Sequence, residues 1–251
     1  MKNLNNLITA KFGGTSLADA SQIKKAVEII KSNPARKFVV LSAPGKRFSD
    51  DIKVTDLLYK CHKQSIGGED FSETLTKISD RYNEIIKDLE IDFDINSEIE
   101  IIKKNLEAGT SPDYPASRGE YINSKIIAKF LGWPFVDAAE IIFFNEKGFL
   151  DETKTFKTAG EKLKSLEYAV IPGFYGAMPD GKIKTFSRGG SDVTGSIIAR
   201  SVLADLYENW TDVSGMLSAD PRIVKNPKVI DYITYTELRE LSYMGASVLH
   251  E

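Results

Sequence analysis

A chain of 251 residues, 42% hydrophobic and 27% charged, is long enough to bury a large core, as one α/β domain or as a domain with a subdomain. Its net charge of −3, without a run of Lys and Arg, gives no basis for nucleic-acid binding, and no apolar run reaches the roughly 18 residues that span a membrane. Cys61 is the single cysteine, so no disulfide can form within the chain, and residues 1–10 have no signal-peptide pattern. We therefore expect a cytoplasmic protein.

The chain opens with a predicted β-α-β unit. The apolar run 7–12 is typical of a strand, and it ends at the glycine pair 13–14, where the chain turns. Apolar residues then recur with helical spacing over 23–30, and the fully apolar run 38–41 predicts a second strand. Uninterrupted apolar strands on either side of a helix favour a parallel sheet covered on both faces.

Ser16 and Asp19 predict the start of that first helix. Their spacing is that of a capping box, with Ser16 as the N-cap and Asp in place of the usual Glu or Gln. Pro34 then ends the helix.

The next part of the chain predicts helices without a strand between them. Helical spacing is seen over 54–66, 69–89 and 96–106, which indicates a helical insertion. Cys61 lies in the first of these stretches, away from the glycine turns, and is interpreted as a packing residue. His62 and His250 are the only histidines, so a histidine-based metal site is not expected.

The middle of the chain alternates short strands with helices. The predicted elements are a helix at 121–131, short strands at 135–136 and 141–144, a helix at 158–166 and a buried strand at 168–171. A hairpin-type turn is expected at 179–181. Glu120 lies near the predicted start of the first of these helices, where a carboxylate favours the helix dipole, so capping and ligand binding both stay open for it.

A second glycine turn precedes the most apolar helix. Gly189 and Gly190 permit a tight turn and a close approach of ligand, and the run 193–202 predicts a buried helix. A helix start leaves backbone N–H groups unpaired and carries partial positive charge, which suits an anion. Arg188 adds a planar guanidinium suited to a carboxylate or phosphate, and Asp192 is a candidate base, metal ligand or cap.

The remaining pattern favours a phosphate-containing ligand. A strand at 205–210 meets a polar turn at 211–215, and a last helix is predicted at 236–244. Ligands of open parallel sheets lie beyond the carboxyl ends of the strands, where Lys11 would oppose the charge of a phosphoryl group. Neither the dinucleotide fingerprint, the P-loop nor the protein-kinase loops are present. The residues alone therefore predict an α/β phosphotransferase or a nucleotide-binding protein.

The segment Lys11-Phe12-Gly13-Gly14-Thr15-Ser16 closely resembles the K-F-G-G-T-S motif of the aspartokinases of the amino-acid kinase superfamily. Four further blocks agree in order and spacing: S-R-G-E at 117–120, R-G-G-S-D at 188–192, W-T-D-V at 210–213 and A-D-P-R at 219–222. The resemblance covers nearly the whole chain. It implies one amino-acid kinase catalytic domain over 1–251, a three-layer α/β/α sandwich around a mainly parallel sheet, with a helical insertion at about 54–107.

The resemblance also implies a reaction. Aspartokinases use ATP, with Mg²⁺, to phosphorylate the β-carboxylate of L-aspartate to 4-phospho-L-aspartate, the first step toward lysine, methionine and threonine. It implies a homodimer for the full-length protein, whereas the charge and the lack of a long apolar run already predict no nucleic-acid or membrane partner. Relatives of this family continue into paired regulatory ACT domains, so we expect these to be missing from this chain.

Residue roles follow from the matching motifs. Lys11 would stabilise charge on the transferring phosphoryl group and Asp192 would organise Lys11. Ser42 would lie near the reacting carboxylate, Glu120 would bind the α-amino group, and Arg188 would bind the α-carboxylate. The aspartate-side turn would also include Gly189, Gly190 and Ser191. The positions expected to face ATP are Lys11, Gly13, Gly14, Thr15, Thr211, Asp212, Leu217, Arg222 and Ser247. No metal ligand is assigned.

Two positions depart from the family pattern. Many relatives have an aromatic residue where this chain has Met216-Leu217, and Lys where it has Ser247. Two alternatives stay open. One is another amino-acid kinase, acting on glutamate, acetylglutamate or uridylate, and the other is a non-catalytic module that binds an amino acid or nucleotide.

Overall fold

A computed structural model of the chain describes residues 7–187, 189–212, 215, 217–219 and 223–243. The chain divides into two compact units, Met1–Trp210 and Thr211–Glu251. Each unit is described by itself.

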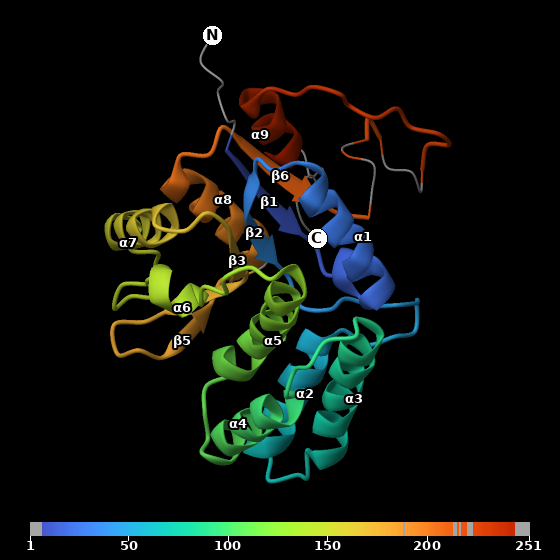
Figure 1. The fold of residues 1–251 in the computed structure, drawn as a ribbon, viewed down its shortest axis with the longest axis vertical. Coiled ribbons are helices and arrows are strands. Elements are labelled where there is room, and N and C mark those ends of the chain that lie inside the picture. Colours follow the sequence, from blue (N-terminus) through green and yellow to red (C-terminus); the bar gives the residue numbers. More distant parts are fainter. Residues whose placement is uncertain (1–6, 188, 213–214, 216, 220–222, 244–251) are drawn as a thin grey trace. The chain divides into compact units, whose positions relative to one another are not determined.

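The first unit is built on a parallel sheet of four strands. The strands are β1 (Ile8–Phe12), β2 (Arg36–Leu41), β3 (Ala169–Pro172) and β6 (Leu206–Trp210), in the order β3-β2-β1-β6 (Figure 1). Phe12 is paired with both Leu41 and Trp210, so the strands end level with one another. The turns that follow β1 and β2 therefore lie at the same edge of the sheet.

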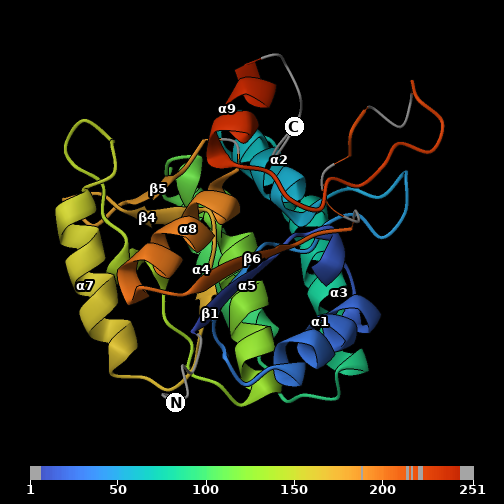
Figure 2. The ribbon, with the colours of Figure 1, turned by 90° about the horizontal axis from the view of Figure 1, so that it is seen from above.

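Helices cover both faces of this sheet (Figures 1 and 2). On one face, Val39 and Leu41 pack with the helices α1 (Ala20–Ser32) and α5 (Asp113–Leu131). On the other face, Val40 and Ile171 pack with α7 (Glu152–Lys164) and α8 (Gly190–Val202). Neighbouring residues of β2 serve opposite faces, as the period of two of a strand requires. The predicted three-layer α/β/α architecture is confirmed.

The three helices that the spacing predicts are present: α2 (Val54–Ile66), α3 (Ser72–Asp88) and α4 (Ile95–Glu107), which lie beside α5 (Figure 1). They bury one apolar stripe each, including Leu58, Ile78 and Ile102. The thiol of Cys61 is buried among them, and burial raises its pKa to about 12. Cys61 is a packing residue, as expected.

The first helix is capped differently from the prediction. Thr15–Leu17 forms a short 3₁₀ helix, η1, and α1 begins after it, with Asp19 as its N-cap. The Asp19 carboxylate accepts the N–H of Gln22 at 2.9 Å. The prediction of Ser16 as the cap is wrong, because the turn continues one 3₁₀ turn beyond the glycine pair.

The largest error concerns α5, which begins at Asp113 and not at 121. The eight residues before 121 include Pro115, but proline is accepted in the first turn of a helix, where its missing N–H has no partner to lose. Gly119 lets this helix approach the loop after β2, since a Cβ there would lie 2.8 Å from that of Ala43.

Smaller differences follow α5. The predicted strand at 141–144 is wrong at its start, since Ala138–Ile141 is a short helix, α6, and Phe143 and Phe144 form only isolated bridges. The helix predicted at 158–166 begins at Glu152, because Asp151 caps it by accepting the N–H of Lys154 at 3.0 Å. The turn at 179–181 joins an antiparallel hairpin, β4 (Tyr175–Ala177) and β5 (Ile183–Thr185).

In the second unit, Leu217 and Val229 form an antiparallel bridge, and α9 spans Tyr235–Tyr243. Thr234 and Glu237 form a capping box before this helix, with the Glu237 carboxylate accepting the Thr234 N–H at 2.8 Å. Within the described ranges, no helix is both long and apolar enough to cross a membrane.

Candidate active site

Lys11 and Asp192 come together at the carboxyl edge of the sheet. Lys11 lies near the end of β1, and its Nζ is 2.7 Å from Oδ1 of Asp192 in the first turn of α8. Only 9% and 18% of the two side chains are exposed. Charges this shielded gain more from each other than a surface pair does, and each holds the other in place. The structure thus places a lysine of fixed orientation beside the glycine turn.

The turn after β1 packs directly on the loop after β2. Gly13 donates its N–H to the carbonyl of Trp210 at 3.0 Å, and Gly45 donates its N–H to the carbonyl of Gly14 at 2.8 Å. A Cβ on Gly14 would lie 2.9 Å from the carbonyl oxygen of Ala43, and one on Gly45 would lie 2.6 Å from the carbonyl carbon of Gly14. Only glycine fits at either side of this contact.

Ser42 and Thr15 flank this contact. The N–H of Ser42 donates to Phe12 at 3.2 Å, and its carbonyl accepts from Nδ2 of Asn123 at 2.8 Å. Ser42 is half-buried, whereas Thr15 is exposed at the start of η1. Both residues therefore lie at the carboxyl ends of neighbouring strands.

The start of α8 is held by the turn after β3. Gly189, the N-cap, has a φ of 77°, and Phe174 has the left-handed φ of 82°, which is uncommon outside glycine. Oγ1 of Thr194 accepts the N–H of Phe174 at 3.0 Å and donates to the carbonyl of Gly190 at 2.9 Å. A Cβ on Gly173 would lie 2.6 Å from Oγ of Ser191. The first N–H groups of α8 are thus presented at the same edge as Lys11.

Glu120 is a buried carboxylate inside α5. It lies seven residues after the first residue of the helix, so the helix-start interpretation is wrong and capping does not explain it. The residue is 5% exposed, and its Oε2 has no hydrogen-bond partner in the described structure. Burial raises its pKa to about 8, although a hydrogen bond from the backbone of Ala43 and the charge of Arg118 act against this. A cation supplied by a ligand would satisfy this carboxylate.

The remaining expected positions lie outside the described residues or in the second unit. Arg188, Arg222 and Ser247 lie outside the described residues. Thr211, Asp212 and Leu217 belong to the second unit, where Oγ1 of Thr211 donates to Oδ1 of Asp212 at 3.1 Å.

Two further residues contribute to the site and are not predicted by the sequence patterns. Asn123, fully buried, lies one helical turn after Glu120 and binds the carbonyl of Ser42. In a helix that begins at Asp113, residues three apart lie on the same face, and this spacing indicates that Asn123 lies beside Glu120. Thr194 lies in the helix that was predicted, but nothing in the sequence indicates its contact with Phe174.

No group of three or more His, Cys, Asp or Glu side chains that could hold a metal ion is found among the described residues. The arrangement can bind an anion between the Gly13-Gly14 turn, Lys11 and the start of α8. It can bind a cation at Glu120. A ligand that carries both an ammonium and negatively charged groups would match these features.

Comparison with known proteins identifies the family of this chain. A model of the amino acid kinase family matches residues 6–251. Aspartokinase 3 of Bacillus subtilis is 40% identical over 255 residues, which cover 96% of this chain and 56% of the relative. Lysine-sensitive aspartokinase 3 of Escherichia coli is 29% identical over 271 residues, covering 98% of this chain and 58% of the relative.

Solved structures agree with the sequence comparisons. Aspartate kinase of Clostridium acetobutylicum is 56% identical, with a TM-score of 0.92 over 98% of this chain and 56% of the other. Aspartokinase III of E. coli, solved with aspartate and ADP, is 27% identical, with a TM-score of 0.81 over 94% of this chain and 56% of the other. The chain spans little more than half the length of these relatives. It belongs to the amino acid kinase family, and within that family it is similar over nearly its whole length to the aspartokinases.

Proposed function

We propose that this chain is an aspartokinase catalytic domain. It transfers the γ-phosphoryl group of ATP to the β-carboxylate of L-aspartate, giving ADP and 4-phospho-L-aspartate, the first step toward lysine, methionine and threonine. The proposal is supported by the names of the relatives in the comparisons and by the E. coli structure that contains aspartate and ADP. On this proposal the protein acts in the cytoplasm, and as a homodimer at full length.

The observation that carries the proposal is Glu120. A carboxylate that is 95% buried without an ion pair to any described residue costs free energy when ionised, which is why its pKa is raised. The α-ammonium of an amino acid would supply the missing charge and three N–H donors. A nucleotide alone offers no such cation, so Glu120 favours an amino-acid acceptor over a site for nucleotides only.

The acceptor carboxylate needs no base. A side-chain carboxyl of this kind ionises at a pH of about 4, so near neutral pH it is already a nucleophile. Ser42 would lie beside it, and Arg188 would bind the α-carboxylate together with the turn at Gly189, Gly190 and Ser191.

Lys11 would oppose the charge on the transferring phosphoryl group. Its Nζ is held by Asp192, so the positive charge is in position before the reaction begins. Backbone N–H groups of Gly13, Gly14 and Thr15 would line the phosphates. The further contacts to ATP would come from Thr211, Asp212, Leu217, Arg222 and Ser247.

Magnesium would be bound with ATP, where it neutralises phosphate charge. An ion bound to the phosphates needs only one or two protein carboxylates, and Asp192 is a carboxylate of the site that could approach it. Because Asp192 already holds Lys11, its main role in this proposal is to orient that lysine.

The test is ADP release with ATP, Mg²⁺ and L-aspartate. Glu120→Gln is expected to raise KM for aspartate about 10- to 100-fold, with kcat changed much less, since a charged hydrogen bond to substrate is lost. L-Glutamate serves as the control acceptor. Preferential turnover of glutamate would replace aspartate by another acceptor, and ATP binding without any turnover would favour the non-catalytic module.

A further inference from the structure

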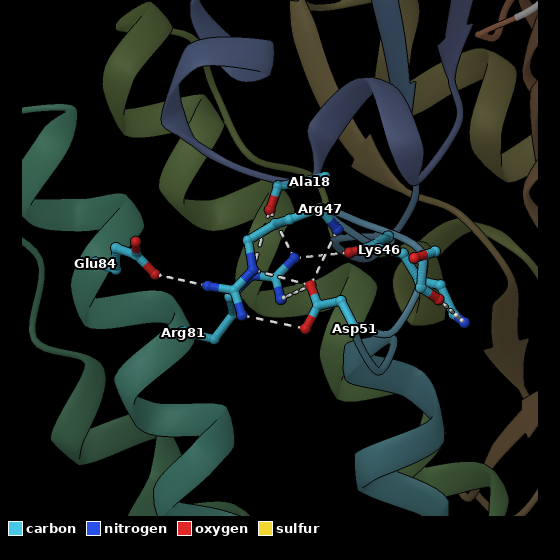
Figure 3. A network of polar contacts seen from close by, with 8 residues as sticks. Ala18, Lys46, Arg47, Asp51, Arg81 and Glu84 are labelled. Carbon is cyan, nitrogen blue, oxygen red and sulfur yellow. Dashed lines mark hydrogen bonds and ion pairs between the residues drawn. The ribbon is translucent and has the colours of Figure 1, made fainter.

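Arg81, on α3, carries a buried guanidinium that binds two backbone carbonyls from other parts of the fold. The residue is 6% exposed. Its Nη2 donates to the carbonyls of Ala18 at 2.8 Å and Gly45 at 2.7 Å, and its Nε donates to Ala18 at 3.3 Å. Its Nη1 lies 2.7 Å from Oδ2 of Asp51 (Figure 3). One side chain therefore joins α3 to the residue that follows η1 and to the loop after β2.

The two carbonyls lie on opposite sides of the glycine contact at the site. The carbonyl of Gly14 accepts both the N–H of Gly45 at 2.8 Å and the N–H of Leu17 at 3.0 Å. Ala18 comes next after Leu17, so Arg81 binds the segment that contains the turn as well as the loop packed on it. The guanidinium thus bridges the two segments that meet at this contact, with two hydrogen bonds to the carbonyl of Ala18 and one to that of Gly45.

Asp51 keeps the guanidinium in place. Its Oδ2 accepts from Arg81 and also from the backbone N–H of Arg47 at 3.0 Å and from Nε of Arg47 at 2.8 Å. Arg47 and Arg81 hold the pKa of the Asp51 carboxyl well below its usual range. The charge of Arg81 is therefore compensated inside the protein, which leaves its other donors for the carbonyls.

Arg47 shares this carboxylate but not the role. In the described structure, the hydrogen bonds of its side chain all go to the carboxylates of Asp51 and Glu84. Its side chain is 30% exposed, against 5% for Arg81. Both arginines bind Asp51, but only Arg81 also binds the carbonyls of Ala18 and Gly45 (Figure 3). Arg47 is therefore a suitable control for Arg81.

We propose that Arg81 is a positioning residue, which holds the turn at 13–17 and the loop at 42–45 at the separation that binding of ATP and the acceptor requires. We call the hydrogen bonds from Arg81 to Ala18 and Gly45 the clamp. The clamp rests on these contacts alone, whereas the ligands for which it positions the two segments rest on the proposed function. A guanidinium is needed because its planar fork reaches two carbonyls and a carboxylate at once. A lysine offers a single nitrogen and cannot span the same three acceptors. Loss of Arg81 leaves two buried carbonyls without their donor.

The experiment compares Arg81→Gln, Arg81→Lys and Arg47→Gln in the whole protein. Hydrogen exchange is measured at the amides of Gly45 and Leu17, with the central-strand amide of Val40 as the internal reference. Steady-state kinetics with ATP and aspartate are measured on the same proteins. Ile78→Val, in the apolar stripe of α3, serves as the control for a loss of stability that leaves all these hydrogen bonds in place.

With Arg81→Gln, we expect exchange at Gly45 and Leu17 to rise at least tenfold relative to Val40, and kcat/KM to fall at least tenfold. Arg81→Lys should recover part of both, and Arg47→Gln and Ile78→Val should leave both within about threefold of wild type. Unchanged exchange at Gly45 in Arg81→Gln overturns the clamp. Raised exchange with unchanged kinetics, in a wild type that phosphorylates aspartate, overturns its role in positioning. If wild type does not turn over aspartate, the proposed function fails, and the exchange data still decide whether the clamp exists.

Discussion

Lys11 and Asp192 meet between β1 and α8 as an ion pair, whereas Glu120, on α5, has no ion-pair partner among the described residues. Both groups are shielded from water, so the difference lies in what compensates the charge. The pair is complete before a ligand arrives and can act on a phosphoryl group without rearranging. The lone carboxylate is incomplete and is expected to be completed by the substrate. One side of the site is therefore suited to the reaction and the other to recognition.

The largest effect on activity is expected when the ion pair of Lys11 and Asp192 is removed. Lys11→Met should lower kcat by about 10²–10³ or more, because a preorganised charge facing the transition state is lost. It should also lower the free energy of unfolding by about 3–5 kcal/mol, since the Asp192 carboxylate loses its lysine. Chemical denaturation and steady-state kinetics measure the two effects.

The double variant Lys11→Met/Asp192→Asn is the control for this first change. It should regain much of the stability but none of the activity. A double variant as unstable as Lys11→Met would show that the loss of stability does not come from the Asp192 carboxylate left without its lysine.

The unpaired carboxylate of Glu120 should make both aspartate binding and stability depend on pH. An ammonium binds the ionised form of Glu120, whose pKa is about 8, so aspartate affinity should rise by up to about tenfold per pH unit from pH 6 to 8. Stability changes in the opposite direction. Between the usual glutamate pKa of 4.5 and the raised pKa of about 8, the folded protein keeps a proton that the unfolded chain has lost. The free energy of unfolding should therefore fall as pH rises from about 5 to 8. Calorimetric titration and denaturation at several pH values measure both.

Glu120→Gln removes the titrating group and should flatten both profiles. A wild-type affinity that is constant over this pH range would mean that aspartate does not bind through the Glu120 carboxylate.

A third prediction compares the effect on stability of substituting Gly14, which contacts Gly45, with that of substituting the adjacent Gly13. Gly14→Ala should lower the free energy of unfolding by about 1–3 kcal/mol, because its Cβ would lie 2.9 Å from a backbone oxygen that cannot move away cheaply. Gly13→Ala should stay within about 1 kcal/mol of wild type, since its Cβ would meet atoms only at 3.6 Å. Thermal unfolding compares them, and equal losses at both glycines would contradict the backbone contact.

The smallest effect is expected at Tyr207 on β6, whose hydroxyl donates to the carbonyl of Asp192 at 3.3 Å. Burial and the charge of Asp192 raise its pKa, so the hydroxyl stays protonated as a donor. Tyr207→Phe should lower the free energy of unfolding by about 0.5–1 kcal/mol and kcat by less than tenfold. A larger loss of kcat than in Lys11→Met would move the centre of the reaction away from the ion pair.

Local sequence patterns were sufficient for the four strands of the parallel sheet, because an apolar run that ends at a turn is encoded in adjacent residues. They were not sufficient for 141–144, where the chain forms a short helix and isolated bridges instead of the predicted strand. They also located Lys11, Asp192 and Glu120 within the motifs. The start of α5 was missed, since Pro115 has opposite meanings inside a helix and in its first turn. Arg81 had no local signal, because its partners Ala18 and Gly45 are distant in the chain, and only the packed structure shows that it is buried.

The pairing of β1 with β6 has a consequence for how the protein folds during synthesis. Gly13 gives its N–H to Trp210, and Ile8 is in register with Leu206, so the first strand needs residues made almost two hundred positions later. At about 5–20 residues per second, the ribosome needs roughly 10–40 s to supply them. During that interval β1 can pair with β2 but keeps one open edge, which is a hazard for association with other nascent chains. The glycine turn can be completed only when this last strand of the sheet has emerged.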